Sequence, residues 1–70
     1  MDFKINLRYI RERNGLTQAE LAEKVGVSQG AVSGYEKGSL RPTIDVCAKL
    51  AKALGVTMDE LMHGERRQVE

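Results

Sequence analysis

The chain has 70 residues, a formal net charge of +1 and one cysteine. It is long enough for one domain, and a domain of this size buries only about 60% of the surface that its unfolded chain exposes. A single cysteine excludes an internal disulfide, and no cysteine–histidine cluster has the spacing of a metal site. No apolar run is long enough to cross a membrane, and no export signal opens the chain. These features favour a small cytoplasmic protein.

The first predicted element is a helix over residues 3–14. Apolar residues at positions 3, 5, 7 and 9 alternate, which is also compatible with a strand. Phe3, Leu7 and Ile10 nevertheless share one helical face, and the segment 8–13 is rich in residues that favour helices. Asn14 and Gly15 are typical of a helix end.

The segment 17–38 predicts two short helices joined by a tight turn. Thr17 and Glu20 have the spacing of a capping box at the start of a helix over 18–25. Gly26 suits the left-handed conformation that ends a helix, and Ser28 is an N-cap for a second helix over 29–37. Two capped helices so close together must cross steeply, which is the helix-turn-helix arrangement. Its contact between helices falls on Ala22, and its inward residues are Leu21, Val25, Val27, Val32 and Tyr35.

Two further helices follow a loop over residues 38–42. Thr43 is the predicted N-cap of a helix over 44–54, which has apolar residues at positions 47, 50, 51 and 54 on one face. Gly55 ends that helix. Thr57 and Glu60 form a second capping box that opens a short fifth helix through Met62. We therefore expect an all-α domain of five helices over residues 1–64, followed by a polar tail over 65–70.

This pattern resembles the DNA-binding domain of the Xre family of regulators, the phage Cro and cI repressor type, from about Phe3 to Met62. The resemblance implies a compact, lambda-repressor-like fold. It also implies a sequence-specific transcriptional regulator, a repressor that binds a pseudo-palindromic operator as a homodimer and needs no cofactor. The net charge of +1 is low for such a domain, so we expect few phosphate contacts.

The helix that starts at Ser28 is expected to enter the major groove. The amide of Gln29 matches the donor and acceptor of adenine there, although an exposed polar residue in the first turn is the alternative. Each helical glycine costs about 1 kcal/mol relative to alanine, which indicates either a close approach to the bases or a frayed, weakly specific helix. The predicted base contacts are Ser28, Gln29, Gly30, Ser33 and Gly34.

The predicted phosphate contacts are Gln18, Arg11, Lys37 and Arg41. Gln18 stands at a helix N-terminus, where free amides and the helix dipole attract anions. The resemblance implies that this glutamine also braces Gln29, and that Arg11 forms a partly buried ion pair with Glu36. For Lys37 and Arg41 the alternative is a solvated surface charge, and for the ion pair it is two unrelated charges.

The remaining chemistry is sparse. Cys47 is expected on the core face of its helix, with redox sensing as the alternative. His63 stands alone and has no support as a metal ligand, and no nucleophile–base pair or pair of catalytic carboxylates points to an enzyme. The rival function is an antitoxin-like adaptor that keeps the fold and binds a protein. The low charge and the two glycines of the second short helix keep that rival open.

Overall fold

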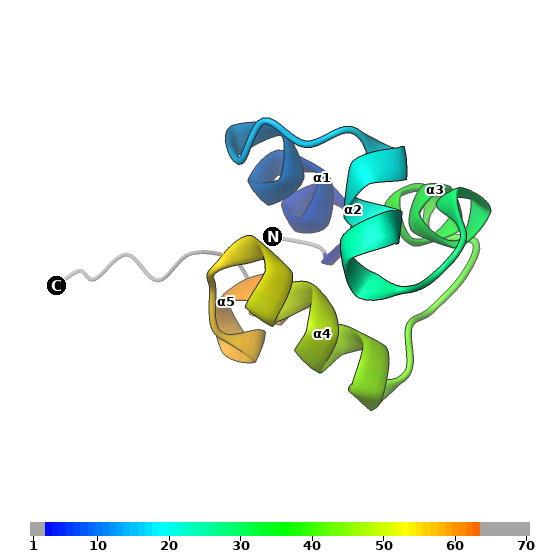
Figure 1. The fold of residues 1–70 in the computed structure, drawn as a ribbon. Helices are drawn as coiled ribbons and strands as arrows, with labels where there is room; N and C mark the ends of the chain where they lie inside the picture. Colours follow the sequence, from blue (N-terminus) through cyan, green and yellow to red (C-terminus); the bar gives the residue numbers. More distant parts are fainter. Residues whose placement is uncertain (1–2, 64–70) are drawn as a thin grey trace, which may run out of the picture.

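The computed structural model describes residues 3–63, so the predicted tail over 65–70 lies outside the described residues. Within this range the chain forms helices and no strand, which confirms the predicted all-α class (Figure 1). The five helices are α1 (Phe3–Arg13), α2 (Gln18–Val25), α3 (Gln29–Lys37), α4 (Ile44–Leu54) and α5 (Met58–His63). α1 ends one residue before the predicted Asn14, and α5 continues beyond the predicted Met62 to include His63. None of these helices has the length and apolar character that a bilayer crossing requires.

Short-range capping contacts define where the helices begin and end. Thr17 Oγ1 accepts the backbone N–H of Glu20 at 3.0 Å, and Glu20 Oε1 accepts that of Thr17 at 2.8 Å. Ser28 and Thr43 cap α3 and α4 in the predicted way, and the same reciprocal box opens α5. Gly26 ends α2 with a φ of 84°, a conformation that costs glycine no steric strain. The turn between α2 and α3 is therefore specified by local sequence.

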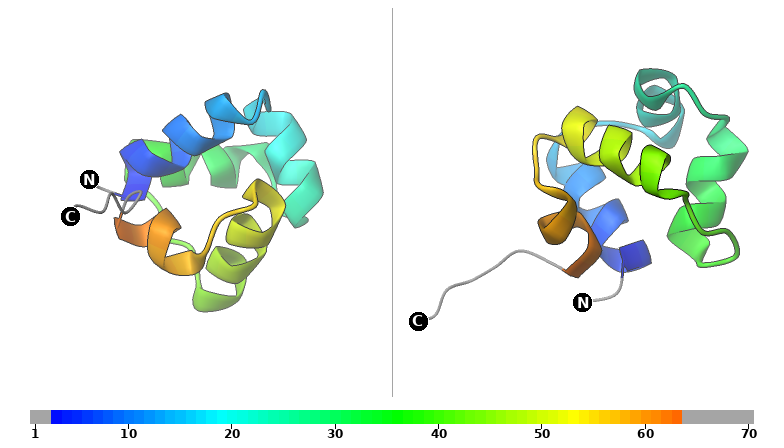
Figure 2. Two further views of the ribbon diagram at one scale, coloured as in Figure 1. Left: turned by 90° about the vertical axis from the view of Figure 1, so that its left-hand side faces the viewer. Right: turned by 90° about the horizontal axis from the view of Figure 1, so that it is seen from below.

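One apolar side of each helix faces a shared core. α2 packs against α3 and α4, while α1 packs against α3 and α5. Figures 1 and 2 show α3 and α5 on opposite sides of the molecule. Of the predicted inward residues, Val27 is half-buried and the others are buried, and Ala22 is buried where α2 meets the core. The fully buried apolar residues are Leu7, Ile10, Leu21, Val32, Leu50 and Leu61.

Asn6 is a buried polar residue that the sequence did not predict. Its amide nitrogen donates to the carbonyl oxygens of Glu60 and Leu61, at 2.6 and 2.7 Å. These carbonyls belong to the last turn of α5, where carbonyl oxygens receive no hydrogen bond from N–H groups of the same helix. Asn6 therefore fastens α5 to α1 and fixes the C-terminal end of the described chain against the core.

Candidate nucleic-acid interface

α3 is fixed to the body by its apolar side and offers a polar side to solvent. Val32 and Tyr35 are buried against the core, whereas Ser28, Gln29 and Gly30 are exposed. Within the described part of the chain, the Gln29 side chain makes no hydrogen bond, so both its donor and its acceptor are available. The first turn of α3 thus combines an open backbone with one free amide side chain.

Further along the same helix, Ser33 and Gly34 are half-buried and thus less open than the first turn. The two glycines of α3 also differ in which atoms lie around them. A Cβ atom added to Gly30 would have only Ser28 Oγ nearby, at 3.8 Å. A Cβ atom on Gly34 would lie 3.0 Å from the Cβ of Leu40, in the following loop. The expectation that both glycines occupy an open face therefore holds for Gly30 alone. Gly34 meets the protein's own loop.

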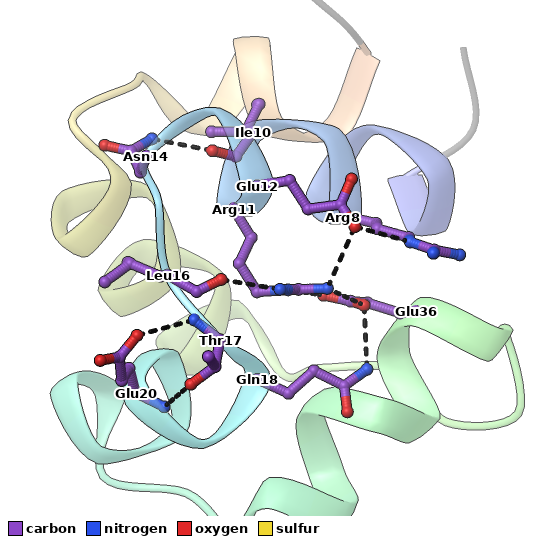
Figure 3. A network of polar contacts seen from close by, with 10 residues as sticks. All are labelled: Arg8, Ile10, Arg11, Glu12, Asn14, Leu16, Thr17, Gln18, Glu20 and Glu36. Carbon is purple, nitrogen blue, oxygen red and sulfur yellow. Dashed lines mark hydrogen bonds and ion pairs between the residues drawn. The ribbon is translucent and has the colours of Figure 1, made fainter.

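Arg11 and Glu36 form a two-pronged ion pair between α1 and α3 (Figure 3). Arg11 Nε donates to Glu36 Oε2 at 2.6 Å, and a terminal nitrogen of the same guanidinium donates to Oε1 at 3.0 Å. The two side chains are 9% and 4% exposed. The hydrogen bonds to Glu36 raise the pKa of Arg11 above its ordinary value, so the guanidinium remains charged. Parallel bonds of this kind restrict orientation as well as distance.

Two more contacts extend this pair to the start of α2 (Figure 3). Arg11 donates its other terminal nitrogen to the carbonyl of Leu16 at 2.7 Å, just before the N-cap of α2. Gln18 Nε2 donates to Glu36 Oε1 at 3.0 Å. Within residues 3–63, Gln18 makes no hydrogen bond to Gln29, so the brace implied by the family resemblance runs to Glu36 instead. The network fixes α1, α2 and α3 relative to one another.

The predicted phosphate contacts separate into buried and exposed residues. Arg11 is buried, and each of its three nitrogens donates one hydrogen bond, to Glu36 or to Leu16. The structure thus confirms its place in the ion pair, and the phosphate contact of Arg11 stays a prediction. Lys37, in the last turn of α3, and Arg41, in the loop after it, are exposed.

A further cation, which sequence reasoning missed, lies beside Arg41. Lys4 and Arg41 both line a surface hollow of about 250 Å³, together with Tyr35 and Gly38. A Cβ atom on Gly38 would lie 2.9 Å from Lys4 Cδ, so the lysine stem crosses the end of α3. A cation is stabilised there by the negative end of the helix dipole. No local signal could reveal this contact, because Lys4 and Gly38 are far apart in the sequence.

The structure shows no grouped metal ligands within residues 3–63. Cys47 is buried on the core face of α4, and its Sγ lies 3.8 Å from the Sδ of Met62. Burial raises the pKa of the Cys47 thiol, which disfavours the reactive thiolate. Cys47 therefore packs as a small apolar residue.

Comparisons of the sequence with family models and with known proteins all point to the same family. The chain matches the model of the helix-turn-helix family over residues 7–61. It is similar to the HTH-type transcriptional activator BcrR of Enterococcus faecalis, with 38% identity over 93% of this chain and 32% of BcrR. It is also similar to the antitoxin HipB of Escherichia coli, with 33% identity over 74% of this chain and 59% of HipB. The chain thus spans about a third of the first relative and somewhat more than half of the second.

The similarity extends to three-dimensional structure. The P22 c2 repressor protein, solved in complex with synthetic operator 9T, has 31% identity and a TM-score of 0.87. The match covers 93% of this chain and 98% of that one. The chain therefore belongs to the Xre-type helix-turn-helix family of transcriptional regulators.

Proposed function

We propose that this protein is a sequence-specific DNA-binding regulator that represses transcription, and that α3 reads the major groove. The observation that carries the proposal is the first turn of α3, where Gln29 has a free amide beside the side-chain-free surface of Gly30. The P22 c2 repressor has the same fold over almost the whole chain and was solved with an operator. A helix held by its apolar side, with its N-terminal turn exposed, fits the docking of this motif.

Base recognition is assigned to the exposed part of this helix. Gln29 forms a bidentate pair with adenine, and the absence of a side chain at Gly30 lets the backbone approach the base edges. Ser28 and Ser33 contribute weaker hydrogen bonds, since a hydroxyl group accepts from or donates to several bases. Gly34 is not included, because the position of its missing Cβ atom faces Leu40 of the protein's own loop. With so few reading side chains, part of the sequence preference comes from the deformability of the DNA.

Phosphate contacts are assigned to both sides of α3. The N-terminal amides of α2, at Gln18, bind one phosphate, and the exposed cations Lys37 and Arg41 bind others. Because only two of these groups carry a full charge, log Kd should change with log salt with a slope of about 2 per protomer. This slope is small for a DNA-binding protein and fits the low net charge.

We assign dimerisation to an apolar surface around the start of α4. Ile44 is 78% exposed there, and it lines a hollow of about 280 Å³ with Phe3, Pro42 and Met62, which Arg41 borders. A second copy of the chain would bury this surface and place two α3 helices in successive major grooves, about 34 Å apart. A pseudo-palindromic operator follows from the two-fold symmetry of such a dimer.

Ile44→Asp should weaken self-association by about tenfold or more, because it places a charge in the apolar contact. Ile5→Asp is the matched control, since Ile5 is also exposed but lies on α1, outside this surface. Sedimentation equilibrium of both variants measures the effect. Equal association constants for Ile44→Asp and the wild type would exclude this interface.

A protein-binding adaptor is the second candidate, and the similarity to the antitoxin HipB is compatible with it. Salt-dependent binding to a random duplex distinguishes the two functions. The proposed regulator binds random DNA at low salt, and Lys37→Gln or Arg41→Gln should each reduce the salt slope by about 1. An adaptor would show no binding that depends on salt, and neither variant would change it. That second result would reject the DNA-binding function.

A further inference from the structure

We infer that Gly34 is a positioning residue, and that its missing side chain determines where Arg41 lies along the DNA backbone. The inference rests on the proposed function, because it assigns Arg41 to a phosphate. It gives Gly34 a role within the protein in place of direct contact with a base.

The first observation is that the loop after α3 folds back onto Gly34. The carbonyl oxygen of Gly34 accepts the backbone N–H of Ser39 at 3.0 Å and that of Leu40 at 3.2 Å. The hydroxyl group of Ser39 donates to the same oxygen at 3.4 Å. One carbonyl near the end of α3 therefore holds two successive loop residues, and Arg41 comes directly after them.

The second observation is that this fold makes the site of a Cβ atom on Gly34 tight. An added Cβ atom on Gly34 would lie 3.0 Å from Leu40 Cβ and 3.5 Å from Leu40 Cδ2. Leu40 Cβ is attached to the backbone, so it cannot rotate away as the end of a long side chain can. A Cβ atom at position 34 therefore requires the loop backbone at Leu40 to shift by a few tenths of an ångström.

The ends of α2 and α4 provide internal comparisons. Val27 N–H donates to the carbonyl of Ala22, and Val56 N–H to that of Ala51, both at 3.0 Å. These alanines occupy the helix position that Gly34 has in α3, so that position tolerates a Cβ atom when the chain then leaves the helix. In α3 the chain folds back for one more residue, so that Leu40 also donates to the carbonyl of Gly34. Of α2, α3 and α4, α3 is the helix that has a glycine at this position.

The consequence concerns Arg41. Arg41 follows Leu40 directly in the loop, and it lines the hollow at the end of α3 with Lys4, Tyr35, Gly38 and Leu40. A shift of Leu40 moves Arg41 relative to α3. Charge-assisted hydrogen bonds to phosphate are short and directional, so a displaced guanidinium loses much of its contact.

The test compares two glycines of one helix. Gly30→Ala should raise the Tm by about 4 °C, because alanine favours helix and the site is open. Gly34→Ala should give no such rise. It should also weaken binding to random duplex DNA by roughly fivefold, part of the loss that a full charged hydrogen bond would cause.

A double-mutant cycle then assigns that loss to Arg41. In the Arg41→Ala background, Gly34→Ala should weaken DNA binding no further. In the Leu40→Gly background, which removes the crowding Cβ atom, it should also have no effect. Independent, multiplying losses for Gly34→Ala and Arg41→Ala would overturn the inference, as would a rise in Tm equal to that of Gly30→Ala. If the wild type failed to bind DNA, the proposed function would fail, whereas the Tm comparison would still test the loop contact.

Discussion

Arg11→Ala is expected to lower the free energy of unfolding by about 3–5 kcal/mol. The substitution leaves the carboxylate of Glu36 buried without its cation, and within residues 3–63 the amide of Gln18 is its remaining side-chain partner. Glu36→Ala should have a similar effect, because among the described residues the buried guanidinium of Arg11 then keeps the carbonyl of Leu16 and a longer contact of 3.9 Å to the exposed carboxylate of Glu12. Domains of this kind have a total stability of roughly 5–15 kcal/mol, so either loss is a large share of it. Urea unfolding measures both.

Two controls isolate the buried charge as the cause. Arg8→Ala breaks an exposed ion pair with Glu12 and should cost less than about 1 kcal/mol. The double replacement Arg11→Met with Glu36→Leu removes both charges together, so it should be far less harmful than either single change. Losses below about 0.5 kcal/mol for both single alanine variants would show that the pair does not hold α1 to α3.

Gln29→Ala is expected to weaken binding to the preferred operator by about 1–3 kcal/mol and to relax the preference at one base pair. The amide of Gln29 is free within the described residues and lies in the first turn of α3. Its removal takes away a bidentate contact without disturbing the fold. Competition binding with operators altered at one position at a time measures both the loss and its location.

Arg41→Ala provides the contrast to Gln29→Ala. A phosphate contact carries no base information, so this substitution should weaken all duplexes alike. Melting curves of both variants check that α3 remains folded. Equal losses for Gln29→Ala on the preferred operator and on random DNA would remove Gln29 from base recognition.

The helices and their order could be predicted from the sequence because their signals are local. Thr17 and Glu20, three residues apart, satisfy each other's backbone groups, and Gly26 ends the helix they open. The apolar spacing of Val32 and Tyr35 likewise predicted which side of α3 is buried. Such signals act within one or two turns, so they survive without knowledge of the fold.

The contacts that the sequence did not reveal join residues far apart in the chain. Asn6 donates to Glu60 and Leu61, and the stem of Lys4 crosses Gly38. Neither residue has a local pattern that names its partner. The surroundings of Gly34 are non-local too: helical spacing alone puts it on the open face with Gly30, and only the fold of the loop brings Leu40 against it.

The central claim is that the exposed side of α3 reads a DNA sequence, and selection from a random duplex pool tests it most directly. The account predicts that the wild type enriches a two-fold symmetric DNA sequence. The Gln29→Ala protein should enrich the same sequence with the base preference lost at one position in each half. A bound pool that stays random at every salt concentration, for a protein that remains folded, would contradict it.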